Sequence, residues 1–146
     1  MFSQTAEYAL RAVVWIAGQD GRSVTTNEIA QGTRVPPDYL SKVLQSLGRG
    51  GLVQGQRGKH GGYTLARPAH RMSILEVVNA VDPLRRIRSC PLGLPGHGLK
   101  LCGLHRRMDD AVRHVEETLA SASIADLLAE TGAARPLCAT PEAAHA

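Results

Sequence analysis

The feature that most constrains this chain is an amphipathic helix that begins at a proline turn and is followed by a glycine-rich, basic hairpin. Pro37 suits the first position of a helix, because its missing N–H would have no partner there. Apolar side chains then recur at the i, i+3, i+4, i+7 spacing of one buried helix face: Leu40, Val43, Leu44 and Leu47. Residues 55–62 hold four glycines, and the flanking stretches 52–54 and 63–65 predict two short strands. A helical unit that carries a basic β-hairpin is therefore expected.

Helix-start signals place further helices before and after this unit. Residue types that cap helix N-termini stand at Ser3, Thr25, Ser73 and Ser123. The expected helices cover residues 4–18, 26–32, 37–48, 74–81, 103–121 and 124–130. Only five residues are aromatic, so the core must consist mainly of Leu, Val, Ile and Ala, which favours helices. The predicted fold class is mainly α with a small β-hairpin, namely a winged helix-turn-helix plus a long dimerisation helix.

The same signals predict how the chain is organised. The expected parts are a winged helix-turn-helix over 1–83, a cysteine-containing sensor loop over 84–102, a dimerisation helix and a short helix over 103–132, and a disordered tail over 133–146. The longest apolar run near the N-terminus, residues 12–17, is far shorter than the about 20 residues that a membrane span needs. We therefore expect a cytoplasmic protein that has no contact with a membrane.

Charge is distributed unevenly along the sequence. Residues 1–88 hold 12 Lys/Arg against 6 Asp/Glu, whereas residues 89–146 hold 5 against 7. The basic first part indicates a polyanionic partner. In the helix after Pro37, the small Ser41 would let the backbone approach DNA, while Lys42 and Gln45 can reach base edges or phosphates. Glycines let the hairpin turn against a sugar–phosphate backbone. The Walker pattern of nucleotide-binding loops is absent from the sequence, so this glycine-rich stretch is not interpreted as a nucleotide site.

Six stretches of sequence carry a more specific signal: residues 7–11, 39–40, 50–53, 57–63, 74–82 and 124–127. In these stretches the chain resembles the IscR/NsrR/CymR winged-helix regulators of bacteria, also called the BadM or Rrf2 family, and the resemblance runs from about residue 3 to residue 130. It implies a homodimer that binds a partly palindromic, double-stranded DNA operator, with the helix from Gly103 crossing between the subunits.

The family's base-contacting positions fall on Asp38, Ser41 and Lys42, and its minor-groove arginine falls on Arg57. The full set of predicted DNA contacts is Thr26, Asp38, Tyr39, Ser41, Lys42, Gln45, Arg57, Lys59 and His60. His60 is interpreted as a phosphate contact rather than a metal ligand. Because side chains in the recognition helix vary across the family, the sequence leaves the operator and the target genes open.

The cysteines indicate a second kind of chemistry. Cys90 and Cys102 flank a loop rich in glycine and proline, and His105 follows Cys102 by one helical turn, on the same helix face. Thiolates bind soft metals and iron–sulfur clusters, but a cluster held by protein alone usually needs four ligands. Other groups must therefore be recruited, such as His105, His97 in the loop, or Glu7 of the partner chain.

The resemblance sharpens this expectation. Cluster-binding members of the family carry three cysteines in this loop, of which the first and third match Cys90 and Cys102, and the middle one falls on Gly96. Some members take the remaining ligand from a position matching His105, others from one matching Glu7. A [2Fe–2S] cluster held by both cysteines and two N/O ligands is the expected cofactor. A cluster-free thiol or small-molecule switch, or no chemical role for the loop, are the alternatives, and Cys138 in the tail is expected to be inert.

The expected function is a transcriptional regulator, a repressor, whose operator binding responds to an iron–sulfur cluster or a redox signal. The signal itself (nitric oxide, iron–sulfur status, redox state or a thiol) is left open. An enzyme is not expected, because a zinc hydrolase using Cys90, Cys102 and His105 would need a general base, and no Glu adjoins them. A winged-helix module for protein contacts is the other alternative; it would need an apolar exposed face on the helix after Pro37, which is polar outside.

Overall fold

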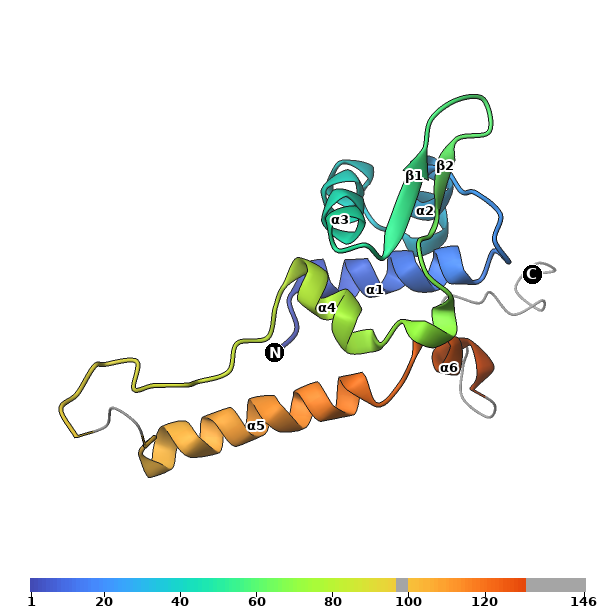
Figure 1. Cartoon of the computed structure of the whole chain (residues 1–146). Coiled ribbons are helices and arrows are strands. Elements are labelled where there is room, and N and C mark those ends of the chain that lie inside the picture. The colour runs from blue at the N-terminus through green and yellow to red at the C-terminus, as the bar shows by residue number, and fades with distance from the viewer. Residues whose placement is uncertain (97–99, 131–146) are drawn as a thin grey trace, which may run out of the picture.

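The computed structural model describes residues 1–96 and 100–130, and Figure 1 shows how its elements are arranged. The elements are α1 (Gln4–Ala17), α2 (Thr26–Thr33), α3 (Pro37–Arg49), β1 (Val53–Gln56), β2 (Gly62–Leu65), the 3-10 helix η1 (Ala69–Arg71), α4 (Ile74–Val81), α5 (Gly103–Ala120) and α6 (Ile124–Ala129). The predicted fold class, mainly helical with one hairpin, is confirmed. The predicted tail of residues 133–146, with Cys138, and the candidate ligand His97 lie outside the described residues.

The predicted helix caps are present. The Ser3 side chain accepts a hydrogen bond from the Ala6 amide at 3.1 Å, and Thr25, Ser73 and Ser123 each form a full capping box. The hairpin strands differ from the prediction, because β1 begins at Val53 rather than at residue 52 and runs two residues further. Leu52 is buried at the base of the hairpin, where its carbonyl accepts from the Ala66 amide at 2.9 Å.

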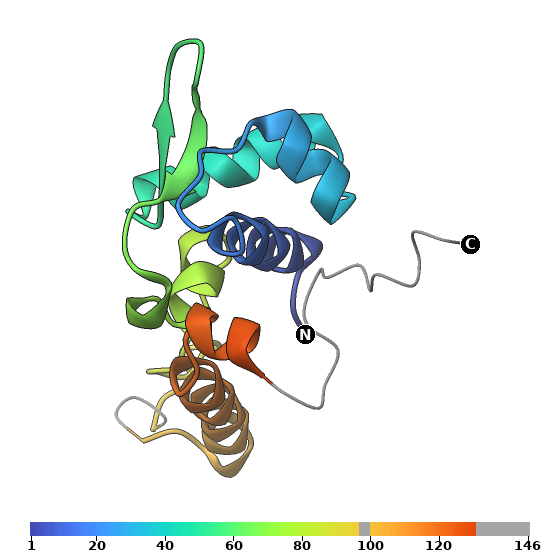
Figure 2. The ribbon, with the colours of Figure 1, turned by 90° about the vertical axis from the view of Figure 1, so that its right-hand side faces the viewer.

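The core surrounds α1, which packs against α2, α3, α4 and α6 (Figure 2). Small residues line its buried face, since Ala6, Ala9 and Ala12 have no exposed surface, and this lets the neighbouring helices approach closely. The sequence grouped α6 with the long helix. In the structure, Ile124 of α6 is fully buried in this same core, and its amide donates to the Met72 carbonyl at 2.8 Å.

Helix α5 differs from the rest. It runs below the winged-helix unit and packs mainly against α4 (Figure 1). The apolar stripe of this helix consists of Leu104, Met108, Ala111, Val112, Val115 and Leu119. Although α5 has 18 residues, none is buried, and Leu104 and Met108 are 65% and 49% exposed. Within the described residues, no helix is long and apolar enough to cross a membrane.

Candidate nucleic-acid interface and sensor loop

The turn between α2 and α3 is fixed from several sides. The buried Thr33 hydroxyl donates to the Ile29 carbonyl at 2.6 Å, and Arg11 of α1 donates to the Thr33 carbonyl at 3.2 Å. Arg34 ends α2 in the left-handed region, at φ 56°. A Cβ at Gly32 would lie 2.5 Å from the Trp15 ring, so only glycine permits this approach of α2 to α1. These contacts hold α3 in one orientation against the core.

Helix α3 has one buried and one exposed face, as its sequence predicts. Leu40, Val43, Leu44 and Leu47 are buried. The exposed side chains include the candidate DNA contacts Asp38, Ser41, Lys42 and Gln45. The Ser41 hydroxyl donates back to the Pro37 carbonyl at 3.2 Å. This polar, exposed face is suited to a DNA groove rather than to an apolar protein partner.

Tyr39 has a role within the fold that the sequence did not indicate. Its hydroxyl shares a hydrogen bond with the Thr5 hydroxyl, and its ring meets the edge of the Tyr8 ring, with centroids 5.4 Å apart and planes at 80°. Arg11 lies over Tyr8, 5.5 Å from the ring centroid. Tyr39 therefore joins α3 to α1, while 38% of its surface stays exposed beside the candidate DNA contacts.

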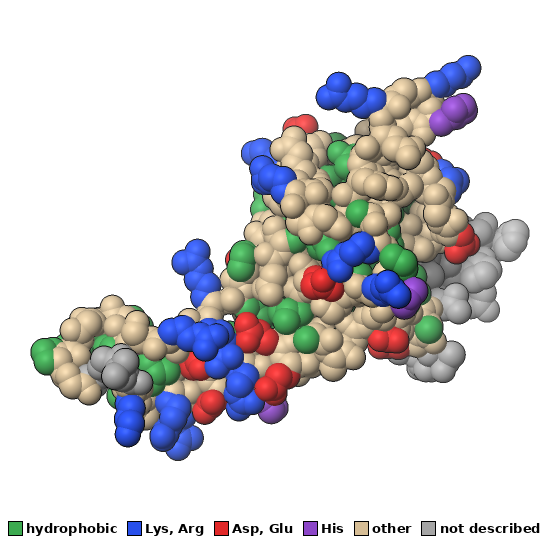
Figure 3. Space-filling view, viewed as in Figure 1, with side chains coloured by type: hydrophobic (Ala, Val, Ile, Leu, Met, Phe, Trp, Pro, Cys, Tyr) green, Lys and Arg blue, Asp and Glu red, His purple; other side chains and the backbone are tan. Residues whose placement is uncertain are grey.

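The hairpin of β1 and β2 has a rigid base and an exposed tip. Tyr63 and Val24 exchange both backbone hydrogen bonds, at 2.7 and 3.0 Å. Gly62 adopts φ 147°, and a Cβ there would lie 2.5 Å from the Val24 carbonyl oxygen, so this position requires glycine. Arg57 and its neighbours at the tip are exposed, and Figure 3 shows basic side chains projecting from the tip. The wing thus presents cations on a fixed support.

A groove of about 430 Å³ lies between the wing and the start of α2. Thr26 is half-buried at the first position of α2 and lines this groove together with Arg57 and Gly61. A helix N-terminus carries a partial positive charge and free N–H groups. Thr26 therefore lies in the groove that the start of α2 forms with the wing.

Of the four candidate metal ligands that the structure describes, Cys102 and His105 lie close together. Cys102 is the N-cap of α5, and its sulfur lies 3.4 Å from His105 Nδ1. Cys90 is 9% exposed at the other end of the loop. Glu7 lies on α1 and pairs with Arg11 at 2.8 Å. Among the residues of this chain that the structure describes, no three His, Cys, Asp or Glu side chains gather closely enough to hold a metal ion.

Arg86 ties the first part of the sensor loop to α5, and the sequence reasoning missed it. Its guanidinium bonds both carboxylate oxygens of Asp109 at 2.6 and 2.7 Å, and reaches Glu116 at 3.4 Å. The Ile87 amide adds a bond to Asp109 at 2.8 Å. The Arg86 bonds are the main reason why the pKa of Asp109 falls to about 2. The sequence held one signal for this contact: Asp109 and Glu116 are two helical turns apart, so they lie on one face of α5, where a single arginine can pair with both.

A polar recognition helix and a basic wing on a three-helix support define the class of winged helix-turn-helix DNA-binding proteins. A family model named Rrf2, with the description "Iron-dependent Transcriptional regulator", matches residues 2–130. The chain belongs to the Rrf2 family of transcriptional regulators, which confirms the resemblance inferred from its sequence.

Similar proteins agree with this assignment. A protein of Mycobacterium tuberculosis H37Rv, named as an HTH-type transcriptional regulator, is 38% identical over 128 residues, or 84% of this chain and 80% of the relative. The solved structure of T. potens IscR has a TM-score of 0.72 at 22% identity, covering 88% of this chain and 85% of IscR. CymR, the global cysteine regulator of B. subtilis, has a TM-score of 0.70 at 22% identity, covering 87% of this chain and 95% of CymR. Both structures share the fold of this chain.

Proposed function

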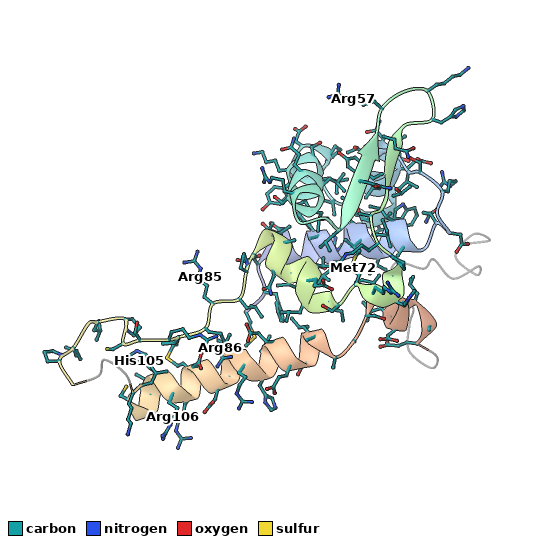
Figure 4. The ribbon with its side chains drawn as sticks, viewed as in Figure 1. Arg57, Met72, Arg85, Arg86, His105 and Arg106 are labelled. Atoms are coloured by element: carbon teal, nitrogen blue, oxygen red, sulfur yellow. The ribbon has the colours of Figure 1, made fainter. Side chains whose placement is uncertain are left out.

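We propose that this regulator binds a partly palindromic operator as a homodimer, with α3 in the major groove and the wing on the adjacent backbone. The observation that carries this proposal is that α3, with its exposed polar face, packs against β1 of the basic wing, and that Arg57 of the wing projects on the side of α3 (Figure 4). In a symmetric dimer the two α3 helices meet half-sites about 34–36 Å apart, one turn of DNA.

The apolar stripe of α5 supplies the dimer contact. A contiguous apolar surface that its own chain leaves uncovered marks an interaction site. A groove of about 740 Å³ runs between this helix and Phe2, and its lining includes Ala111, Val115 and Leu119. A two-fold axis perpendicular to α5 would pair this helix antiparallel with its copy. A second copy of α5 fits this surface.

The signal acts at the sensor loop in this proposal. A [2Fe–2S] cluster would be held by Cys90, Cys102 and His105, with Glu7 of the partner subunit or His97 of the loop as a further ligand. The proximity of Cys102 to His105 supports a shared ligand pair. Mixed Cys/His ligation occurs for this cluster type and raises its reduction potential, so the bound cluster would supply one-electron redox chemistry. Arg86 then links the loop to the dimer helix.

A cluster-free thiol switch is the second candidate. It is favoured by the small number of ligands that one subunit gathers among its described residues. Two cysteines at the ends of one loop suffice for reversible thiol–disulfide chemistry with a small oxidant or thiol. The same link through Arg86 would carry that change to α5.

One set of protein preparations distinguishes the cluster from the thiol switch. Protein is purified and reconstituted without oxygen, and its visible spectrum, iron, sulfide and operator affinity are measured. The cluster proposal predicts iron and sulfide in the wild type, their loss in Cys90→Ala and Cys102→Ala, and a labile cluster in Glu7→Ala and His105→Ala. Cys138→Ala and His114→Ala are the matched controls.

Absence of iron in the reconstituted wild type, or full retention in Cys90→Ala, contradicts the cluster. The thiol switch then predicts that oxidant and reductant change operator affinity in the wild type but not in Cys102→Ala. If neither cluster reconstitution nor oxidant and reductant change operator affinity, both candidates are contradicted. The protein would then bind DNA without this sensor.

A further inference from the structure

We propose that Arg85, in the linker between α4 and α5, contacts a DNA phosphate between the two half-sites of the operator. This inference rests on the proposed binding of operator DNA by a dimer. It adds a third contact region to α3 and the wing, at a position that the sequence signals for DNA binding do not include.

The linker is held on both sides of Arg85. The Leu84 amide donates to the Asn79 side chain of α4 at 3.0 Å. On the other side, Arg86 and the Ile87 amide bind Asp109 of α5 at 2.6–2.8 Å. An arginine between two such anchors keeps its backbone position when a ligand binds, so less conformational entropy is lost on forming the contact.

The two consecutive arginines point to opposite sides of the linker. Figure 4 shows Arg86 directed toward α5, whereas Arg85 extends to the side of the molecule where Arg57 projects from the wing. Basic side chains over α3 lie along this same edge in Figure 3. Arg85 is exposed, and no carboxylate among residues 1–96 and 100–130 forms an ion pair with it. Its charge is therefore available on the DNA-facing side.

The anchor also places Arg85 near the middle of the dimer. Asp109 and Glu116, the two partners of Arg86, lie on either side of the midpoint of α5 (Gly103–Ala120). In a dimer whose two α5 helices pack antiparallel and overlap over their whole length, the midpoints of these helices lie at the two-fold axis. On DNA this axis passes between half-sites about one turn apart, where backbone phosphates face the dimer. Arginine is the side chain best suited to such phosphates, because its planar fork can donate two parallel hydrogen bonds.

The test compares Arg85→Ala with Arg106→Ala on a duplex from the chain's own upstream region, at several salt concentrations. Arg106 is also exposed, but Figure 4 places it beyond α5, on the side away from α3 and the wing. Each lost phosphate contact should cost about fivefold in affinity near 0.15 M salt, and two contacts per dimer should flatten the log K against log salt slope by about 1.8. Arg106→Ala should match the wild type, and Arg85→Lys should recover most of the slope.

A second arm removes the charge from the DNA instead. Neutral methylphosphonates at the central phosphates should weaken the wild type and leave Arg85→Ala unchanged, while sedimentation shows that all variants are dimers. An Arg85→Ala slope equal to that of the wild type, or an equal loss in Arg106→Ala, overturns the inference while operator binding stands. A wild type that forms no complex with any duplex overturns the proposed function itself.

Discussion

Helices α1 and α5 differ in how much of their apolar surface the chain itself covers. Both are amphipathic, yet α1 buries six of its 14 residues against its own chain, whereas α5 buries none of its 18. The winged-helix half is a complete core of small and branched apolar side chains. The half below it packs mainly against α4, leads into the buried α6 at one end, and is tied by the Arg86 ion pairs to the linker that follows α4.

The difference shows where each half obtains its stability. Apolar surface buried within one chain stabilises that chain at any concentration. Apolar surface left for a partner stabilises only the assembly, so its contribution depends on protomer concentration. In the proposed dimer, the rigid winged-helix unit would be attached to a helix whose position depends on the second subunit and on the loop of residues 84–102.

The largest effect is expected from a charge in the apolar stripe of α5. Met108→Asp should convert the dimer to monomer at micromolar concentration and abolish operator-specific binding, because an unpaired carboxylate would be buried in the interface. Its helix content should stay unchanged, since Met108 is 49% exposed in the single chain. Sedimentation checks this prediction, with Arg106→Asp on the outer face as the control. A Met108→Asp variant that remains dimeric would show that subunits meet elsewhere.

The second effect contrasts two leucines, one from each half. Leu44→Ala should lower the free energy of unfolding by about 2–5 kcal/mol, because Leu44 has no exposed surface and a cavity would remain. Leu104→Ala should leave unfolding of the monomeric Met108→Asp background almost unchanged, since Leu104 is 65% exposed. Urea unfolding measures both. Equal losses for the two leucines would contradict the division drawn between the halves.

The third effect concerns the exposed polar face of α3. Lys42→Ala should weaken operator binding by about 1–3 kcal/mol if the lysine meets a base edge, with a much smaller loss on unrelated DNA. Lys100→Ala, an exposed lysine of the sensor loop, is the matched control. Anisotropy titrations on both duplexes provide the values. An equal loss on the two duplexes would assign Lys42 to phosphate contact only.

The smallest effect is a pH dependence of the Arg86 link. Arg86 lowers the pKa of Asp109 from 3.8 to about 2, so the stability gained from this pair is full above about pH 4 and is lost as the pH falls toward 2. The difference in thermal midpoint between wild type and Asp109→Asn should therefore be constant above pH 4 and shrink below it. A constant difference down to pH 2 would mean that the pair adds nothing to stability.

Local signals in the sequence predicted most of the fold. Capping residues such as Ser73 and Ser123, and the apolar spacing of α3, act over three or four residues, so they can be recognised without knowing the rest of the chain. The family assignment also came from short local motifs. The exact bounds of the hairpin strands did not, because they depend on the burial of Leu52 against distant helices.

Long-range contacts were the part that the sequence could not supply. The bonds of Arg86 to Asp109 span 23 positions, and the contact of Tyr39 with Thr5 spans 34. Nothing in the local pattern distinguishes Arg86 from its neighbour Arg85. The candidate metal ligands could be predicted from the sequence only in part, for the same reason. Cys102 and His105 are one helical turn apart, so their proximity is local, whereas a contribution from Glu7 would need a second subunit.

Stoichiometric binding to its own upstream region tests the central claim most directly. Full-length protein, both apo and anaerobically reconstituted, is titrated against the labelled duplex at low salt. Sedimentation then gives the molar mass of the complex. We predict two chains per operator, an affinity that falls steeply with salt, and a complex that is lost in Met108→Asp. No complex with either form of the protein, or a complex with one chain per operator, would contradict a dimeric winged-helix regulator.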